Sequence, residues 1–426
     1  MKEIIVSGTG IISALGNNEE ENLRALLENR SGISKLQYLQ TSHIDFPVGE
    51  VKMTDEEMIE ILQISKNNPT TRTSLLGMLA VSEALQNAHI TPFTSHRSPP
   101  IIALVSGTTV GGMDKSEQFY IDFLENETKN AYISTHDCGA CTEMIADHFG
   151  IFSQVDTLST ACSSAANAII LGAELLQSGR AEVVVAGGSE CLTKFHLNGF
   201  NTLMILDKNP CRPFDATRAG INLGEGAAYL VMETTESFNK RMRHHPTLKA
   251  LCKLSGYANT CDAYHQTASS PEGGGSFLAM KQALKMANLA PEQIDYINAH
   301  GTGTENNDLS EGTAIVRVFG ETIPPVSSTK SFTGHTTSAA GSVEAVFSIL
   351  ALQNNFIPSN LNFSKKMPEL PFAPFFNLRP SDTRNGTQGD HTSQISNHKS
   401  QIEIKHVLTN SFGFGGNDSC LIFSKL

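Results

Sequence analysis

Five short runs of β-branched and apolar residues recur along the chain, and each is followed directly by a glycine-rich turn. The runs are EIIVSGTGI, IIALVSGTTVGG, EVVVAGGSE, DYINAHGTGT and VLTNSFGFGG. Continuous apolar runs of this length are typical of buried strands in α/β proteins, where the loops at the strand ends carry functional residues. The pattern therefore predicts buried strands that end at glycine-rich loops.

Apolar residues recur every three or four positions in four longer stretches, which predicts helices at 73–87, 161–178, 276–287 and 342–353. Strands that alternate with helices predict a layered α/β fold. The polar segment KRMRHHP at 240–246 interrupts the apolar pattern, so we expect two halves, 1–245 and 246–426. Each half opens with a similar alternation of strand and helix, which permits an internal duplication.

Polar composition sets one segment apart from the core. The stretch DTRNGTQGDHTSQISNHKS contains scarcely an apolar residue, which predicts an exposed insertion over about 381–400 with no catalytic role.

Composition and charge narrow the function. The 426 residues include 31 Lys and Arg against 43 Asp and Glu, and the net charge of −12 disfavours a protein that coats nucleic acid or an anionic membrane. No apolar run is long enough for a membrane span and no signal-peptide pattern opens the chain, so we expect a soluble, cytoplasmic protein. Eight cysteines without a secretion signal indicate reduced thiols.

The stretch DTLSTACSSAANAIILGAELLQSG places Cys162 where a short strand meets the start of an apolar helix. Unpaired backbone N–H groups and the helix dipole lower the pKa of a thiol at that position, so Cys162 is a candidate nucleophile. A small buried cysteine at a crowded junction would look the same in the sequence, and such cysteines are common in proteins.

Three further stretches carry groups that suit acyl chemistry. His300 ends an apolar strand in DYINAHGTGTENNDLSE, and Lys330, His335 and Glu344 belong to SSTKSFTGHTTSAAGSVEA. Taken singly, such a histidine could be structural and such a lysine could lie on the surface. The loop NSFGFGGNDSC places glycines where a backbone has to approach a ligand closely, and its amides could stabilise an oxyanion.

Six ordered motifs together resemble those of the β-ketoacyl synthases. They are VSGTGIISALG, TACSSAANAI, RPFDATRAGINLGEGAA, HGTGTENND, KSFTGHTTSAAG and NSFGFGGN. The resemblance implies a thiolase-like fold with two pseudo-duplicated halves in a five-layered α/β/α/β/α arrangement. It also implies a decarboxylative Claisen condensation of malonyl thioesters with acyl chains carried on the phosphopantetheine of acyl carrier protein. No bound cofactor or metal is implied, and the expected assembly is a homodimer, or a heterodimer with a synthase-like partner.

The resemblance also implies roles for individual residues. Cys162 matches the acylated cysteine, His300 and His335 match the histidines of decarboxylation, and Lys330 with Glu344 matches their supporting pair.

Further matched positions concern the substrate. The backbone amides of Cys162 and Phe412 are expected to form the oxyanion hole, with the Phe412 ring as a gate over the acyl pocket. Val110 is expected to limit the depth of that pocket, and Thr302 and Thr304 to bind the pantetheine arm.

The chain departs from many elongating synthases at one segment. Residues 218–221 read RAGI where those enzymes carry an aromatic residue, so Ile221 makes that side of the acyl pocket less bulky. The segment RAGINLGEGAA is similar in sequence to the corresponding segment of synthases from aryl-polyene and related pathways. An acidic carrier protein also calls for a local basic patch, for which the candidates are Lys66, Arg72, Lys208 and Arg212, although each could be a solvated surface residue.

A metal site, a nucleotide site and two related kinds of protein are the alternatives to this hypothesis. The segment HDCGAC offers His136, Cys138 and Cys141 to zinc, but no second ligand pair is evident. Neither glycine-rich loop has a nucleotide-binding spacing, and KRMRHH fits a solvated linker better than a nucleic-acid patch. A catalytically silent, chain-length-factor-like subunit would typically lack the cysteine. A thiolase that uses coenzyme A would need a second catalytic cysteine, and Cys420 lies in a predicted strand.

Overall fold

The computed structural model describes residues 2–65, 67–90, 100–377 and 403–426. The insertion predicted at 381–400 and Lys66 of the predicted basic patch lie outside the described residues. Within the described ranges, no helix combines the length and the apolar character that a bilayer span requires.

The described strands form one ten-stranded sheet that contains the same five-stranded unit twice. The first unit has the order β3-β2-β4-β5-β1. Its strands are β1 (Ile4–Ser13), β2 (Ile102–Gly107), β3 (Gln154–Leu158), β4 (Val183–Glu190) and β5 (Gly226–Thr234). Strand β2 runs parallel to β3 and β4, whereas β5 runs antiparallel to β4 and β1.

The second unit repeats this order and these directions. Its strands are β6 (Cys252–Cys261), β7 (Tyr296–Asn298), β8 (Val326–Ser327), β9 (His406–Gly413) and β10 (Asn417–Ser424), in the order β8-β7-β9-β10-β6. Strand β7 is parallel to β8 and β9, and β10 is antiparallel to β9 and β6. The two units meet where β1 pairs with β6, with Ile4 opposite Leu254. The topology thus confirms the pseudo-duplication that the sequence only permitted.

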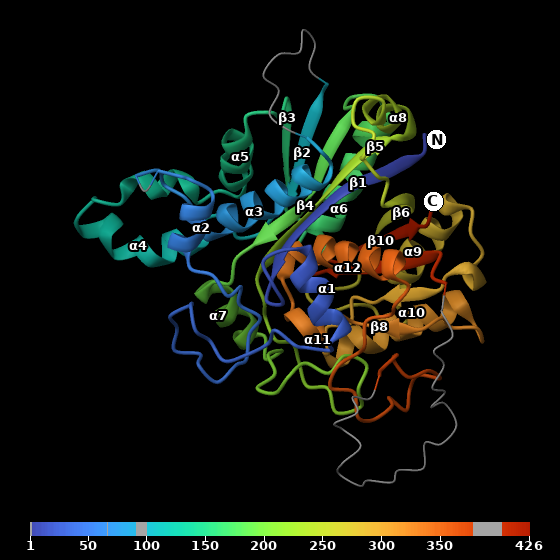
Figure 1. The fold of residues 1–426 in the computed structure, drawn as a ribbon. Coiled ribbons are helices and arrows are strands. Elements are labelled where there is room, and N and C mark those ends of the chain that lie inside the picture. The colour runs from blue at the N-terminus through green and yellow to red at the C-terminus, as the bar shows by residue number, and fades with distance from the viewer. Residues whose placement is uncertain (1, 66, 91–99, 378–402) are drawn as a thin grey trace.

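Helices complete the layers around the two units (Figure 1). Helices α3 (Arg72–Asn87) and α5 (Cys138–Phe149) pack on the first unit, and α9 (Gly274–Ala287) and α10 (Glu305–Phe319) cover the second. Helices α6 (Ser164–Gln177) and α12 (Ala340–Asn354) pack on each other and on strands of both units. Every residue of α12 as far as Leu352 is buried, as a central layer requires. The predicted five-layered arrangement is confirmed.

The remaining helices connect these layers. They are α1 (Glu19–Leu27), α2 (Asp55–Ile61), α4 (Met113–Glu125), α7 (Lys194–Thr202), α8 (Thr235–Met242) and α11 (Lys330–Thr333), with short 3₁₀ turns at Asn130–Thr135, Pro291–Gln293 and Thr337–Ala339. Helix α8 precedes the predicted boundary at 245 and β6 follows it. The exact position of that boundary stays a prediction.

Several glycines predicted to form turns lie inside strands instead. Gly8 belongs to β1, and a Cβ atom there would lie 2.5 Å from the carbonyl oxygen of Ala84 in α3. Gly107 ends β2, where a Cβ would lie 2.6 Å from the backbone nitrogen of Ala165 in α6. These glycines let helices approach the sheet closely, a tertiary requirement that resembles a turn signal in the sequence.

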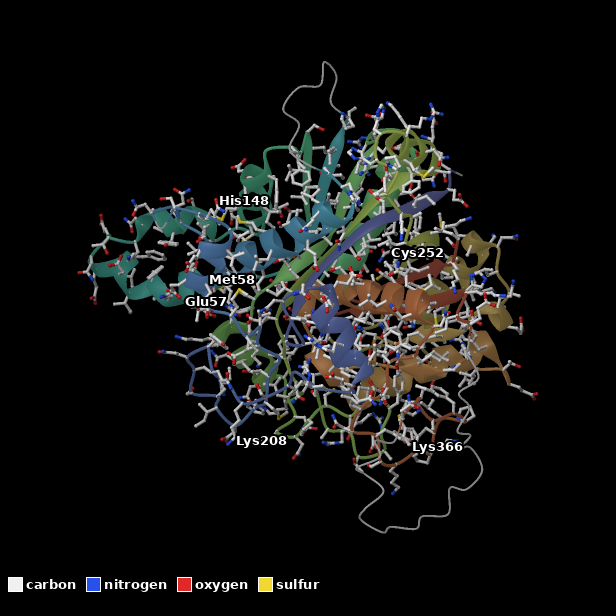
Figure 2. The ribbon with its side chains drawn as sticks, in the orientation of Figure 1. Glu57, Met58, His148, Lys208, Cys252 and Lys366 are labelled. Carbon is white, nitrogen blue, oxygen red and sulfur yellow. The ribbon has the colours of Figure 1, made fainter. Side chains whose placement is uncertain are left out.

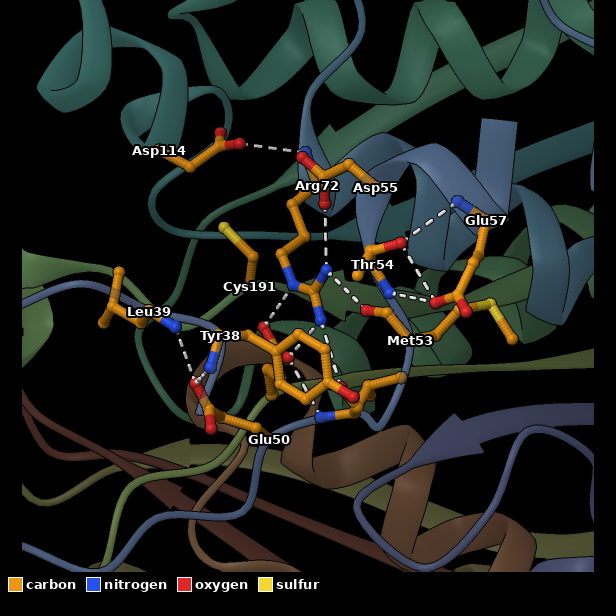
Figure 3. Close-up of polar contacts among 12 residues, drawn as sticks. Tyr38, Leu39, Glu50, Met53, Thr54, Asp55, Glu57, Arg72, Asp114 and Cys191 are labelled. Atoms are coloured by element: carbon orange, nitrogen blue, oxygen red, sulfur yellow. Dashed lines mark hydrogen bonds and ion pairs between the residues drawn. The ribbon is translucent and has the colours of Figure 1, made fainter. Parts of the chain in front are cut away.

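Arg72 is buried at the start of α3, where it holds three segments together (Figure 3). Its guanidinium lies 2.7 Å from Oε1 of Glu225 and 2.9 Å from Oδ1 of Asp55, and it donates to the carbonyls of Val51 and Met53. The Arg72 side chain is only 11% exposed and that of Glu225 only 2%. The prediction that Arg72 belongs to a carrier-binding patch is therefore wrong, because its side chain is nearly buried and its donors are taken up by Glu225, Asp55 and two backbone carbonyls.

Replacement of Arg72 tests this role. We expect Arg72→Met to lower the free energy of unfolding by about 3–5 kcal/mol, because the buried Glu225 carboxylate loses its partner. Urea denaturation followed by circular dichroism measures the change. Lys208→Ala is the control, since Lys208 and its partner Asp45 are exposed and such a pair contributes about 1 kcal/mol or less. A loss for Arg72→Met as small as that of the control would contradict a structural role.

Candidate active site

Cys162 lies at the junction between β3 and α6. The preceding residue, Ala161, has a φ of +51°, an uncommon backbone conformation that reverses the chain before the helix begins at Ser164. Cys162 is 7% exposed, and its side chain lines a cavity. The strand and helix that the sequence predicted on either side of Cys162 are both present.

Two imidazoles from the second half of the chain face this sulfur. Nε2 of His335 lies 3.1 Å from Sγ of Cys162. The rings of His300 and His335 lie 5.4 Å apart between centroids and are nearly perpendicular, at 85°. His300 follows β7 and His335 follows α11, so the fold joins groups that are far apart in the sequence.

Lys330 contacts the Nδ1 side of the His300 ring. Its ammonium forms an ion pair with Glu344 and lies 3.2 Å from Nδ1 of His300. An ammonium has only donors, so Nδ1 accepts the hydrogen bond and the ring proton resides on Nε2. Lys330 is 2% exposed, and the predicted support of the histidines by Lys330 and Glu344 matches this geometry.

Glu311 is a positioning residue whose role the sequence motifs did not reveal. Its carboxylate accepts the backbone N–H of His300 at 2.9 Å and that of Gly301 at 2.7 Å. Asn410 donates a third hydrogen bond at 3.0 Å, and burial raises the pKa of Glu311 to about 7. Glu311 occurs at the end of the stretch DYINAHGTGTENNDLSE, but only the tertiary structure turns its side chain back onto His300.

Burial dominates the ionisation of the central groups. It raises the pKa of the Cys162 thiol to about 11, although the charge of Lys330 and backbone hydrogen bonds lower it. The predicted thiolate is therefore wrong for the resting state, because desolvation outweighs the helix terminus. Burial and the charge of Lys330 lower the pKa values of His300 and His335 well below their usual range. At neutral pH the cysteine and both imidazoles are uncharged.

Two backbone amides lower the pKa of the Cys162 thiol, and one of them differs from the amide that was expected near the sulfur. They belong to Cys162 itself and to Phe414. Phe412 was expected to supply the second amide, but it lies within β9, whereas Phe414 lies on the turn that follows. The Phe412 ring packs 5.7 Å from that of His300, and the Phe414 ring stacks on Phe200 of α7 at 5.9 Å. The role of the Phe412 ring as a gate stays a prediction.

A cavity of about 490 Å³ leads to these groups. Its lining includes seven of the residues predicted from the sequence: Cys162, Ile221, His300, Thr302, Thr304, His335 and Phe412. Val110 is buried beside Glu190 and does not line this cavity, so its role in an acyl pocket stays a prediction.

Arg218 stabilises the turn that carries Thr302 and Thr304 by hydrogen bonds to its backbone. The two threonine hydroxyls lie 2.9 Å apart, and the Thr304 side chain also caps α10. Arg218 donates to the carbonyl of Thr304 at 3.2 Å and to that of Glu305 at 3.0 Å. Within the RAGI departure, Arg218 therefore supports the predicted pantetheine turn, while Ile221 lines the cavity.

Two of the remaining candidates for a basic patch, Arg212 and Lys208, each form an ion pair with an aspartate. Arg212 forms an ion pair with the buried Asp207 at 2.9 Å and donates to backbone carbonyls. Lys208 is exposed (Figure 2), and its ammonium lies 3.3 Å from Oδ2 of Asp45. An apolar side chain, that of Met204, also lines the cavity, and it is 87% exposed. Arg212 therefore neutralises a buried carboxylate of the fold, and a role of Lys66, Lys208 or Arg212 in carrier binding stays a prediction.

Neither a zinc site nor a thiolase cysteine is supported at the positions that the sequence offered. His136 hydrogen-bonds to Ser116 at 2.7 Å, and no group of three or more His, Cys, Asp or Glu residues suited to a metal occurs within the described ranges. Cys420 is buried in β10 and does not line the cavity, so it lacks the position that a second thiolase cysteine would need.

Comparisons with known proteins agree with this geometry. The family model for the β-ketoacyl synthase N-terminal domain matches residues 1–237, and that for the C-terminal domain matches residues 251–364. A 3-oxoacyl-[acyl-carrier-protein] synthase 2 of Coxiella burnetii is 28% identical over 437 residues, which cover 100% of this chain and 99% of that protein.

Two solved structures resemble the whole chain. The ishigamide ketosynthase/chain length factor has a TM-score of 0.86 and 26% identity, with 100% of this chain and 99% of that chain covered. The ketosynthase ApeO in complex with its chain length factor ApeC, from Xenorhabdus doucetiae, has a TM-score of 0.81 and 28% identity, with 100% and 98% covered. This chain has the thiolase-like ketosynthase fold and belongs to the β-ketoacyl synthase family.

Proposed function

We propose that the protein is a β-ketoacyl-acyl carrier protein synthase, which transfers an acyl chain to Cys162 and condenses it with a malonyl thioester. The observation that carries this proposal is the contact of 3.1 Å between Cys162 Sγ and His335 Nε2, with His300 held beside them by Lys330. Condensation lengthens the chain by two carbons and releases carbon dioxide.

The first step is transfer of the acyl group from the carrier thiol to Cys162. The resting thiol is neutral, so its proton has to leave as the S–C bond forms. Nε2 of His335 is the basic atom within hydrogen-bond distance; it takes the proton and returns it to the departing pantetheine thiol. One thioester replaces another, and the imidazole ends neutral. The amides of Cys162 and Phe414 stabilise the oxyanion of the tetrahedral intermediate.

The second step forms the carbon nucleophile. The bond between the malonyl carboxylate and its α-carbon breaks, carbon dioxide leaves, and the electron pair becomes an enolate on the thioester. Nε2–H of His300 donates to the enolate oxygen, since Lys330 fixes that tautomer. Nδ1 of His335 has no partner within the described residues, so no second bond fixes its tautomer, and Nε2 can accept in one step and donate in another.

The third step joins the two chains. The enolate carbon attacks the thioester carbon on Cys162, the oxyanion forms again at the two amides, and the sulfur leaves as the new C–C bond completes the β-ketoacyl product. A proton from solvent water then returns the Cys162 thiolate to its neutral state. All three steps occur in a buried site, where fixed donors stabilise charge more effectively than water does.

We further infer the partners and setting of the reaction. The substrates are carried on the phosphopantetheine of acyl carrier protein, whose arm enters past Thr302 and Thr304.

Four apolar side chains on α4 and the adjacent 3₁₀ turn are each at least half exposed, which favours a dimer. They are Tyr120, Ile121, Leu124 and Ile133. The partner is a second copy or a synthase-like chain such as a chain length factor. We place the enzyme in the cytoplasm, with its halves divided near residue 245.

Acylation of Cys162 tests the function. Incubation with an acyl-carrier substrate should add the mass of one acyl group to the Cys162 peptide, and addition of malonyl-carrier protein should then release carbon dioxide and the extended product. Mass spectrometry of the intact protein and its peptides measures both. Cys162→Ala should take up no acyl group, and an unlabelled Cys162 in the wild type would instead favour a silent partner subunit.

Replacement of Lys330 tests the support of His300. We expect Lys330→Met to lower the rate of malonyl decarboxylation by about 100-fold or more, because His300 loses the partner that fixes its donor tautomer. Because the two residues act as one unit, the double variant with His300→Ala should lose little more than either single variant. Release of labelled carbon dioxide is the measurement, and fully additive losses would contradict the linkage.

The pH dependence of alkylation tests the state of the cysteine. A thiol whose pKa is raised to about 11 gains thiolate about tenfold per pH unit below that value. Iodoacetamide should therefore alkylate Cys162 faster at each step from pH 7 to 10, as measured on the Cys162 peptide. A rate that levels off below pH 7 would show a thiolate at rest and would refute the neutral thiol.

A further inference from the structure

The side-chain oxygen of Asn417 joins three separate segments of the chain. Asn417 begins β10, directly after the glycine turn that carries Phe414. Its Oδ1 lies 2.7 Å from Oγ of Ser163 and 2.8 Å from Nδ2 of Asn167, both at the start of α6. Nδ2 of Asn259 on β6 approaches the same oxygen at 2.7 Å. None of these side chains takes part in acyl transfer, decarboxylation or condensation, so their convergence requires another explanation.

The partners of Asn417 fix the orientation of its amide. The Nδ2 atoms of Asn167 and Asn259 can only donate, so the atom that faces them is the carbonyl oxygen of Asn417. Asn167 donates its second N–H to Oγ1 of Thr160 at 2.9 Å and accepts from Ser419 through Oδ1 at 2.8 Å. Since both ends of the Asn167 amide are bonded, its side chain provides a fixed support for Asn417 at the start of α6.

The turn before Asn417 is built from residues that do not hold a conformation by themselves. Gly415 and Gly416 have φ values of +86° and +77°, a region that glycine enters freely. Gly415 is also exposed, and within the turn Gly416 donates to the carbonyl of Gly413 at 3.2 Å. Glycine has more backbone conformations to lose than other residues, so contacts with the surrounding segments determine where the Phe414 amide lies.

This turn packs directly against the segment that carries Cys162. A Cβ atom at Gly413 would lie 3.3 Å from the backbone nitrogen of Cys162 and 3.1 Å from Oγ of Ser163. The Ser163 hydroxyl therefore lies beside the start of the turn at Gly413 and contacts its end at Asn417. Ser163 is fully buried, so its hydroxyl is closed to water. One buried side chain thus connects the turn with the segment of the nucleophile.

We propose that Asn417 is a positioning residue of the oxyanion hole, which it completes by holding the Phe414 amide beside that of Cys162. Its hydrogen bonds to Ser163 and Asn167 are the means. The inference rests on the proposed condensing function, in which the two amides stabilise the oxyanion. Asn417 does not line the cavity, so it acts through the turn and not on the substrate. Oxyanion donors have to lie within about 2.7–3.1 Å of the oxyanion, and a displacement of about 1 Å can lower a rate about 100-fold.

The three steps of the reaction depend on this contact to different degrees. Acyl transfer and condensation both form an oxyanion at the amides of Cys162 and Phe414. Decarboxylation instead develops its charge on an enolate oxygen, which accepts from Nε2–H of His300. Loss of the Asn417 acceptor should therefore slow acyl transfer and condensation while leaving decarboxylation unchanged, whereas a general loss of folded protein lowers all three rates equally.

Asn417→Leu tests the proposal, because it removes the acceptor and keeps a side chain of similar size. We expect it to lower the rate of acyl transfer to Cys162 about 10- to 100-fold, since removal of an oxyanion donor outright costs about 100- to 1,000-fold. The rate at which malonyl-carrier protein, offered alone, releases carbon dioxide should stay at the wild-type value. Mass spectrometry of the Cys162 peptide measures the first rate, and labelled carbon dioxide measures the second. Equal losses in both rates, or no loss in acyl transfer, would overturn the proposal.

Two matched variants separate the contact with α6 from its surroundings. Asn417→Asp keeps an oxygen that accepts from the same donors, and it should retain acyl transfer within about threefold of the wild type. Asn259→Leu removes only the donor on β6 and leaves the two at the start of α6, so its rate should also stay within about threefold. A loss in either variant as large as that of Asn417→Leu would contradict the role assigned to this contact.

A double variant tests the link between Asn417 and Ser163. Ser163→Ala should slow acyl transfer and not decarboxylation, and its combination with Asn417→Leu should lose little more than Asn417→Leu alone, because the two residues act through one contact. Fully additive losses would count against the link. The wild type reports separately on the condensing function: if it accepts an acyl group and releases carbon dioxide while Asn417→Leu behaves like the wild type, that function stands and only the role of Asn417 is refuted.

Discussion

The active site depends on one buried cation. Lys330 is almost fully buried, and its ammonium is paired with Glu344 on one side and with Nδ1 of His300 on the other. A charge in that position is tolerable only because the carboxylate compensates it. The same charge determines which nitrogen of His300 carries the proton and lowers the pKa values of both catalytic imidazoles. A single ion pair thus fixes the tautomer of His300 and adds to the effect of burial, which is the larger cause of the neutral state of both rings.

The duplicated topology explains why the groups meet. Helices α6 and α12 occupy equivalent positions in the two halves and pack on each other in the central layer. Cys162 precedes α6, while His335 precedes α12 and Glu344 lies within it. The packing of two equivalent helices therefore places the nucleophile of one half against the proton donors of the other. Neither half alone contains the reacting set.

Burial has opposite effects on the two kinds of group. Desolvation raises the pKa of the Cys162 thiol and lowers those of His300 and His335, since in each case it disfavours the charged form. The resting groups around the sulfur are consequently neutral apart from the Lys330 and Glu344 pair. Charge develops only as substrate bonds change, at positions where backbone amides and imidazole N–H groups already point.

Local patterning of the sequence determined the strands, the main helices and, through ordered motifs, the family and the residues Cys162, His300, Lys330 and His335. It did so because apolar periodicity and short motifs reflect constraints between neighbours in the chain. Tertiary structure alone decided the charge state of Cys162, the assignment of the amide to Phe414, the burial of Arg72 and the contact of Glu311 with His300. Each of these depends on desolvation or on a partner far away in the sequence. A window of a few residues shows neither how deeply a group is buried nor which distant residue it contacts.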